Sequence, residues 1–161
     1  MRISKVETSI LQAPEDGRPH WVSHFIVPRA NELLVRLQTD EGVCGFGLAT
    51  CYSSVEPVVN AINSGITAEV VGCDPLAPER LYEKLFSLTA KRLAHEKGWS
   101  RDALLKISAA VDLACWDIIG KTAGLPLYQL FGGYRDRVPC YVTCAYYRDG
   151  KDEVELRDEI Q

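Results

Sequence analysis

Two histidines in a proline-rich stretch are the first side chains in this sequence that suggest chemistry. His20 and His24 stand four residues apart, with Trp21 between them. On a helix, this spacing would let both imidazoles reach one metal ion. The surrounding prolines argue against a helix, and a loop that carries His and Trp is better suited to touch a ligand. Substrate contact, a metal site and a solvated or self-packed loop all stay open at this point.

A second candidate for ligand contact is the segment from Thr50 to Ser54, which joins a predicted strand to a predicted helix. The hydroxyl groups of Tyr52 and Ser53 are available to a ligand there. Ser53 or Ser54 can instead cap the helix that follows, because serine is a favoured residue at helix N-termini.

Asp112 and Asp117 invite interpretation as paired carboxylates for acid–base catalysis. Five residues along a helix correspond to a rotation of about 140°, so the two side chains do not share a face. Asp117 and Lys121 are four residues apart and can form an ion pair. We therefore predict structural roles for these acids. Because no Ser-His-Asp or Cys-His set can be assembled either, we identify no catalytic residue and no metal ligand in this chain.

Composition excludes several classes of partner. The chain has 161 residues, a net charge of −4 and a pI near 5.4, and its basic residues are scattered among acids, which argues against nucleic acid. No apolar run is long enough for a bilayer, and no export signal stands at the start, so we expect a cytoplasmic protein. We interpret its six cysteines as reduced, mostly buried, small hydrophobic residues.

Alternating apolar residues predict strands over 3–11, 32–39 and 43–50, with a long loop over 12–30. The Asp40–Gly42 turn makes the second and third strands antiparallel neighbours. On one face of the second strand we expect Leu33, Val35, Leu37 and Thr39, and on one face of the third strand Cys44, Phe46 and Leu48.

The apolar period then changes to that of helices, which we predict from Ser53 or Ser54 to about residue 70, from Pro78 to about residue 97, and over 102–122. Small residues in the third helix, such as Ala110 and Gly120, would let another helix approach. A short helical turn follows at 126–131. The glycine pairs Gly45/Gly47 and Gly132/Gly133 match no phosphate-binding pattern and indicate close packing or turns.

A further strand is predicted at 138–145, followed by a helix-prone stretch at 151–161. A strand and helix placed after three helices resemble the first unit of a parallel sheet, which needs more strands to pair with. We therefore expect the chain to be the front part of a longer protein. The predicted fold class is α+β: a three-stranded antiparallel sheet followed by a helical bundle over 1–133, then the first β-α unit of a truncated (β/α) barrel over 134–161.

The stretch Ala109–Lys121, continued through Gly124–Gly133, closely resembles the signature of the mandelate racemase/muconate lactonizing enzyme family of the enolase superfamily. The resemblance extends to Arg2–Glu7, to Thr39–Gly42 with Gly45 and Gly47, and to Gly72–Pro75. It covers nearly the whole chain and implies an amino-terminal capping domain in front of a modified TIM-type barrel.

In that family, the barrel holds Mg²⁺ on three acidic residues, and a Lys or His base removes the proton α to a substrate carboxylate. All of these groups would lie after Gln161, so the resemblance implies Mg²⁺ in the full-length enzyme and no metal ligand or base here. The capping loops would be 14–29 and 49–55. The resemblance thus assigns substrate-binding roles to His20, Trp21, His24, Tyr52 and Ser53.

The substrate implied is a small carboxylate, with an acid sugar as the best specific guess, and the reaction is that of a dehydratase (a lyase) or of a racemase or cycloisomerase (isomerases). The full-length protein is expected to be a homo-oligomer, and the 161-residue chain alone to be inactive. The alternative is a non-catalytic, free-standing cap or a partner-binding domain.

Overall fold

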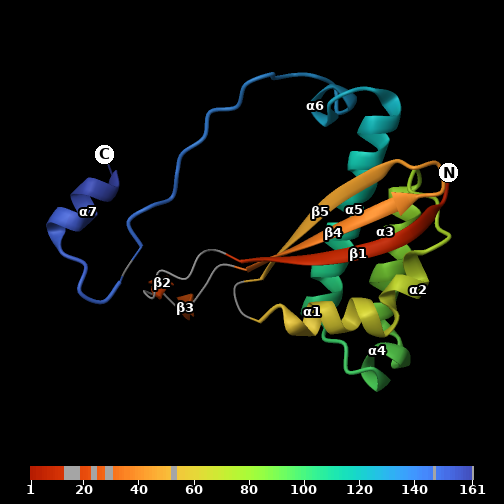
Figure 1. Cartoon of the computed structure of the whole chain (residues 1–161), viewed down its shortest axis with the longest axis horizontal. Coiled ribbons are helices and arrows are strands. Elements are labelled where there is room, and N and C mark those ends of the chain that lie inside the picture. Colours follow the sequence, from red (N-terminus) through yellow and green to blue (C-terminus); the bar gives the residue numbers. More distant parts are fainter. Residues whose placement is uncertain (13–18, 23–24, 28–30, 52–53, 147, 161) are drawn as a thin grey trace.

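The computed structural model describes residues 1–12, 19–22, 25–27, 31–51, 54–146 and 148–160. A three-stranded antiparallel sheet with the order β1-β4-β5 lies on a layer of helices (Figure 1). Its strands are β1 (Ile3–Gln12), β4 (Asn31–Thr39) and β5 (Cys44–Cys51). This confirms the predicted sheet and places β4 at its centre.

Strand β4 shows the alternation that its sequence predicts. Leu33, Val35 and Leu37 have no exposed surface, and the residues between them are partly exposed. On β5, Phe46 and Leu48 do share a face, but it is the open face of the sheet, where they are 44% and 46% exposed. The buried positions of β5 are Gly45, Gly47, Ala49 and Cys51.

Helix α5 (Arg101–Ala123) packs directly on these small residues of β5. A Cβ atom added at Gly47 would lie 1.9 Å from the carbonyl oxygen of Ala110, and one added at Gly45 would lie 2.1 Å from that of Ala114. The small residues of α5 around Ala110 therefore pack against strand β5, whereas we expected them to pack against another helix. The helix begins at a cap in which Ser100 Oγ accepts from the Ala103 amide at 3.1 Å, and it ends at Gly124, whose φ of 65° few other residues adopt.

Shorter helices complete the layer. A bent helical segment contains α1 (Glu56–Ala61), η1 (Ile62–Ile66) and α2 (Thr67–Val70). Next come α3 (Pro78–Ser87), η2 (Leu88–Ala90) and α4 (Arg92–Glu96). The expected serine cap on α1 is wrong for Ser54, because its hydroxyl hydrogen-bonds the Glu56 carboxylate and the helix begins after Val55 without a side-chain cap.

One hydrophobic core lies between the sheet and the helices. Its buried members run along the chain from Ile3 to Ile118, and they include Leu33, Ile66, Leu85 and Leu104. The sheet and the helices up to α5 thus share one apolar interior, as a self-contained domain requires.

The expected long loop between β1 and β4 contains a second, two-stranded sheet. Strands β2 (His20–Val22) and β3 (Phe25–Val27) pair antiparallel, so the prediction of a loop over the whole of 12–30 is wrong for these residues. Three-residue strands are too short to show an alternation that sequence reading can detect.

After α6 (Leu127–Leu130) the chain runs away from the sheet to α7 (Glu153–Ile160), as Figure 1 shows. The strand predicted at 138–145 is not formed: within the described part of the chain, these residues belong to no sheet, and Tyr141 and Val142 are 91% and 86% exposed. A strand exists only where a neighbour supplies ladder hydrogen bonds.

The cysteines are less buried than expected. Cys51 and Cys115 are buried, Cys44 and Cys73 are half-buried, and Cys140 and Cys144 are exposed. Burial raises the pKa of the Cys115 thiol to about 12, so this side chain behaves as a small hydrophobic residue.

Among the helices that the structure describes, none has the length and apolar character needed to span a bilayer.

Candidate functional site: a hairpin and the turn before the last helix

The β2–β3 hairpin projects from one end of the large sheet (Figure 1). The last ladder position of β1 and β4 joins Gln12 to Asn31, and Gln12 Nε2 donates to Asn31 Oδ1 at 3.1 Å. The connection between these strands therefore leaves the sheet at a fixed point. This arrangement holds His20 and Trp21 beyond the sheet, away from the hydrophobic core.

Within the hairpin, His20 pairs with Val27, and Trp21 pairs with Ile26. His20 and Trp21 are both half-buried, and Val27 is 4% exposed. The imidazole can donate and accept hydrogen bonds, and the indole offers an apolar surface with one N–H donor. Both side chains suit contact with a polar, hydroxylated ligand. The other three predicted contact residues, His24, Tyr52 and Ser53, lie outside the described residues.

Tyr146 joins the candidate site from a distant part of the chain. Its ring lies against His20, with 4.9 Å between ring centroids and an angle of 41° between planes. Sequence reasoning missed this residue, because only the fold brings the segment before α7 to the hairpin. The one sequence signal was its position directly after the predicted strand at 138–145, since strand ends often carry binding residues.

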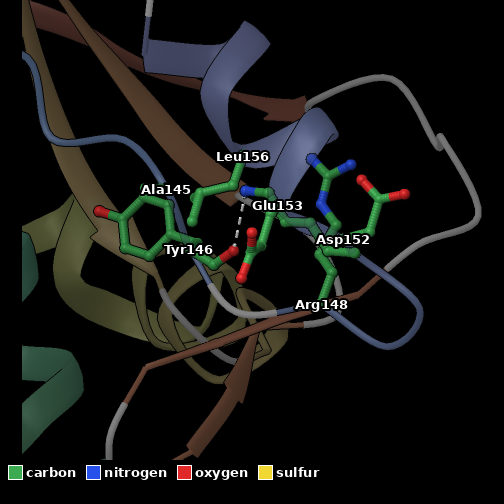
Figure 2. Close-up of a pocket in the computed structure, with 7 residues that line it drawn as sticks. Ala145, Tyr146, Arg148, Asp152, Glu153 and Leu156 are labelled. Atoms are coloured by element: carbon green, nitrogen blue, oxygen red, sulfur yellow. Dashed lines mark hydrogen bonds between the residues drawn. The ribbon is translucent and has the colours of Figure 1, made fainter.

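The turn that presents Tyr146 is held by side chains of the following helix. Ala145 has a φ of 63°, a left-handed conformation that costs a non-glycine residue roughly 1–2 kcal/mol. Its amide donates to Glu159 Oε1 at 3.0 Å. Lys151 Nζ donates to the Tyr146 carbonyl at 3.1 Å, drawn as a dashed line in Figure 2, and forms an ion pair with Glu159.

Electrostatics support this anchoring role. The hydrogen bond from Lys151 is the main cause that lowers the pKa of Glu159, so the carboxylate stays charged at neutral pH. The Lys151 side chain is only 7% exposed and is committed to these two acceptors. Lys151 therefore fixes the backbone of the turn at Tyr146. A hollow of about 180 Å³, lined by Lys151, Tyr146 and Leu156 among others, lies beside this turn (Figure 2).

The geometry of the described residues supports binding and contains no complete catalytic set. In the part of the chain that the structure describes, no three His, Cys, Asp or Glu side chains gather where they could hold a metal ion. The described residues therefore do not fit a Mg²⁺ site. The two acids considered for catalysis have structural surroundings: Asp117 pairs with Lys121 at 2.6 Å, as predicted, and burial raises the pKa of Asp112.

Comparison with known proteins identifies this arrangement. Residues 5–132 match the family described as mandelate racemase/muconate lactonizing enzyme, N-terminal domain. The chain belongs to this family. The match includes β4, β5 and most of β1, together with the α5 signature helix and Gly132. The scaffold that carries the hairpin is therefore the capping domain of the enolase superfamily.

Among curated relatives, the chain is 35% identical over 132 residues to a D-galactonate dehydratase family member from Musicola paradisiaca. It is 33% identical over 123 residues to an arabinonate dehydratase from Saccharolobus solfataricus. These alignments cover 80% and 76% of this chain but only 28% and 31% of the relatives. The chain thus spans less than a third of the length of either relative.

Solved structures share the fold. A mandelate racemase/muconate lactonizing enzyme superposes with a TM-score of 0.75 at 29% identity, over 90% of this chain and 38% of that one. A racemase from Streptomyces coelicolor, solved with bound magnesium, gives a TM-score of 0.67 at 26% identity, over 82% and 36% of the two chains. The fold class of the capping domain is therefore confirmed.

Proposed function

We propose that this chain is the capping, substrate-selecting part of a Mg²⁺-dependent enolase-superfamily enzyme that removes the proton α to a carboxylate. Residues 1–133 form the cap and residues 134–161 begin a barrel domain. Acid-sugar dehydration is the favoured reaction, in which the α proton and the hydroxyl group on the neighbouring carbon leave together as water. Racemisation of a carboxylate is the second possibility.

The observation that carries the proposal is the His20–Tyr146 contact, 4.9 Å between ring centroids, within a chain that belongs to this family. It joins the hairpin of the cap to the turn that follows residues 138–145. In this proposal, the contact marks the place where the hairpin closes on the barrel. The dehydratase names of the relatives support the choice of acid sugars.

The contribution of the chain itself is selection and shielding. His20 and Trp21 offer hydrogen bonds and apolar surface to a bound sugar acid, and closure of such a loop removes water from the reacting carbon. Exclusion of water strengthens every electrostatic interaction in the site. Mg²⁺ belongs to the barrel in this proposal, and no described residue of this chain takes part in its binding.

The test is an assay of the complete natural gene product with Mg²⁺ and a panel of acid sugars that includes galactonate and arabinonate. Proton NMR in ²H₂O reports loss of the α proton, and formation of a keto acid reports dehydration. We expect exchange and dehydration of at least one substrate, and no turnover by the 161-residue chain alone. A folded gene product that neither exchanges nor dehydrates any tested carboxylate would overturn the proposal.

A further inference from the structure

A second hollow lies at the other end of the sheet from the hairpin. It measures about 210 Å³ and is formed by the start of β1, the turn over residues 72–77 and one side of α3. In Figure 1 this region surrounds the N-terminus, whereas β2 and β3 lie at the far end of β1. The hollow is therefore separate from the candidate functional site.

Three cationic side chains line this hollow: Arg2, Arg80 and Lys84. Lys84 is already engaged, because its Nζ lies 3.2 Å from Glu69 Oε2 and also donates to the Glu69 carbonyl. In the part of the chain that the structure describes, the guanidinium groups of Arg2 and Arg80 have no hydrogen bond or ion pair. Two guanidinium groups are thus available at one hollow.

The backbone around Arg2 is held in place on both sides. The Arg2 amide donates to Asp40 Oδ1 at 2.7 Å, and the Arg2 carbonyl accepts from the Asp40 amide at 2.9 Å. The next residue, Ile3, exchanges hydrogen bonds of 2.9 and 2.8 Å with Cys73 and Gly72. The Arg2 side chain is therefore attached to a backbone that is already fixed, which lowers the entropic cost of binding a ligand there.

One carboxylate, Asp74, also lines the hollow, but it has a local function. Its Oδ1 accepts from the Leu76 amide at 3.0 Å and so stabilises the turn before α3. The Asp74 charge balances one of the two available guanidinium groups. The lining keeps an excess of positive charge once the Lys84–Glu69 pair is counted as neutral.

We propose that this hollow binds a phosphate group, either free or as a phosphate monoester. A guanidinium group presents N–H donors in a planar fork that matches phosphate oxygens in bidentate fashion. Arg2, directly before β1, and Arg80 on α3 supply two such groups, and the net positive charge that remains beside Asp74 favours an anion. The site is independent of the proposed carboxylate chemistry and lies too far along the sheet to share its ligand.

The experiment titrates the 161-residue chain with inorganic phosphate at constant ionic strength, with chloride as the replaced anion. Chemical shifts of the arginine side-chain N–H groups report binding. Arg80→Gln removes one of the two guanidinium groups. Arg92→Gln is the matched control, because Arg92 is an exposed arginine on α4 that pairs with Glu96 at 2.7 Å. Arg2→Gln removes the second guanidinium group.

We expect saturable binding that weakens roughly tenfold in Arg80→Gln and in Arg2→Gln and stays unchanged in Arg92→Gln. Because neither guanidinium group has a hydrogen bond or ion pair with another described residue, both variants should keep the wild-type melting temperature. Shifts that never saturate, or an equal loss in Arg92→Gln, would overturn the proposal. Wild-type affinity in Arg80→Gln would do the same.

Discussion

Asp117 hydrogen-bonds the free edge of the sheet. Its replacement should therefore lower the free energy of unfolding by more than the loss of an ordinary surface ion pair does. Strand β5 has no neighbour beyond it among the described strands, so its outer backbone groups lack ladder partners. Asp117 Oδ2 accepts from the Phe46 amide at 2.9 Å, and Lys121 Nζ donates to the Cys44 carbonyl at 2.8 Å. The ion pair thus occupies edge positions that another chain would otherwise bind.

The expected loss for Asp117→Ala follows from these contacts. A hydrogen bond to a charged group contributes about 1.5–3 kcal/mol, and an exposed pair four residues apart on a helix about 0.3–0.5 kcal/mol. The Asp117 side chain is 33% exposed, so water replaces part of the lost bond. We predict a loss of about 1.5–2 kcal/mol, or about 3–8 °C in Tm for a chain of this size.

The same helix supplies the control. Asp102 and Lys106 have the same spacing and an N–O distance of 2.7 Å. Asp102→Ala should cost less than about 1 kcal/mol, including the lost interaction with the helix N-terminus. Urea unfolding followed by circular dichroism measures both variants, and light scattering detects association through the opened edge. Equal losses in the two variants would refute the reasoning.

Three further predictions concern packing, ionisation and metal. Gly47→Ala should cost about 3 kcal/mol or more, because the new Cβ would meet the Ala110 carbonyl at 1.9 Å; an unchanged urea midpoint would contradict this. Burial, with a smaller contribution from Glu79, raises the pKa of Asp112, so its ionised form destabilises the fold and this penalty disappears as pH falls. Asp112→Asn should therefore raise stability by a few tenths of a kcal/mol at about pH 7 and leave it unchanged near pH 3, and thermal melts that show no pH dependence of this difference would speak against it. Millimolar Mg²⁺ should leave the Tm of the 161-residue chain unchanged, and a rise of several degrees would reveal a metal site in it.

Local sequence patterns predicted the sheet and the long helix well. Leu33, Val35 and Leu37 alternate with polar residues, and this period of two fixes which face of β4 is buried. The apolar period predicted a helix over 102–122, and α5 lies over Arg101–Ala123. Such features depend on neighbours in the chain, which a sequence displays directly.

Features that depend on distant partners were missed. The sequence placed Gly45 and Gly47 in a strand but did not reveal that the backbone of α5 lies against them. The apolar segment 138–145 has the composition of a strand, yet without a neighbouring strand it stays unpaired. Composition sets the tendency to form a strand, and pairing decides the outcome.

The candidate site was predicted only in part, for the same reason. His20 and Trp21 could be chosen from residue type and loop context. Tyr146 could not be matched with His20, because their contact depends on the left-handed turn at Ala145 and its anchoring by Glu159. Hydrogen bonds of this kind leave no periodic trace in a sequence.

The central claim is that the hairpin of the cap selects the substrate, and substrate preference in the complete natural gene product tests it most directly. The measurement is the ratio of kcat/KM values for two acid sugars in wild type, in His20→Ala and in His95→Ala, where His95 is an exposed histidine on α4, outside the hairpin. The account predicts that His20→Ala changes this ratio severalfold and that His95→Ala leaves it unchanged. A wild-type ratio in His20→Ala would contradict it.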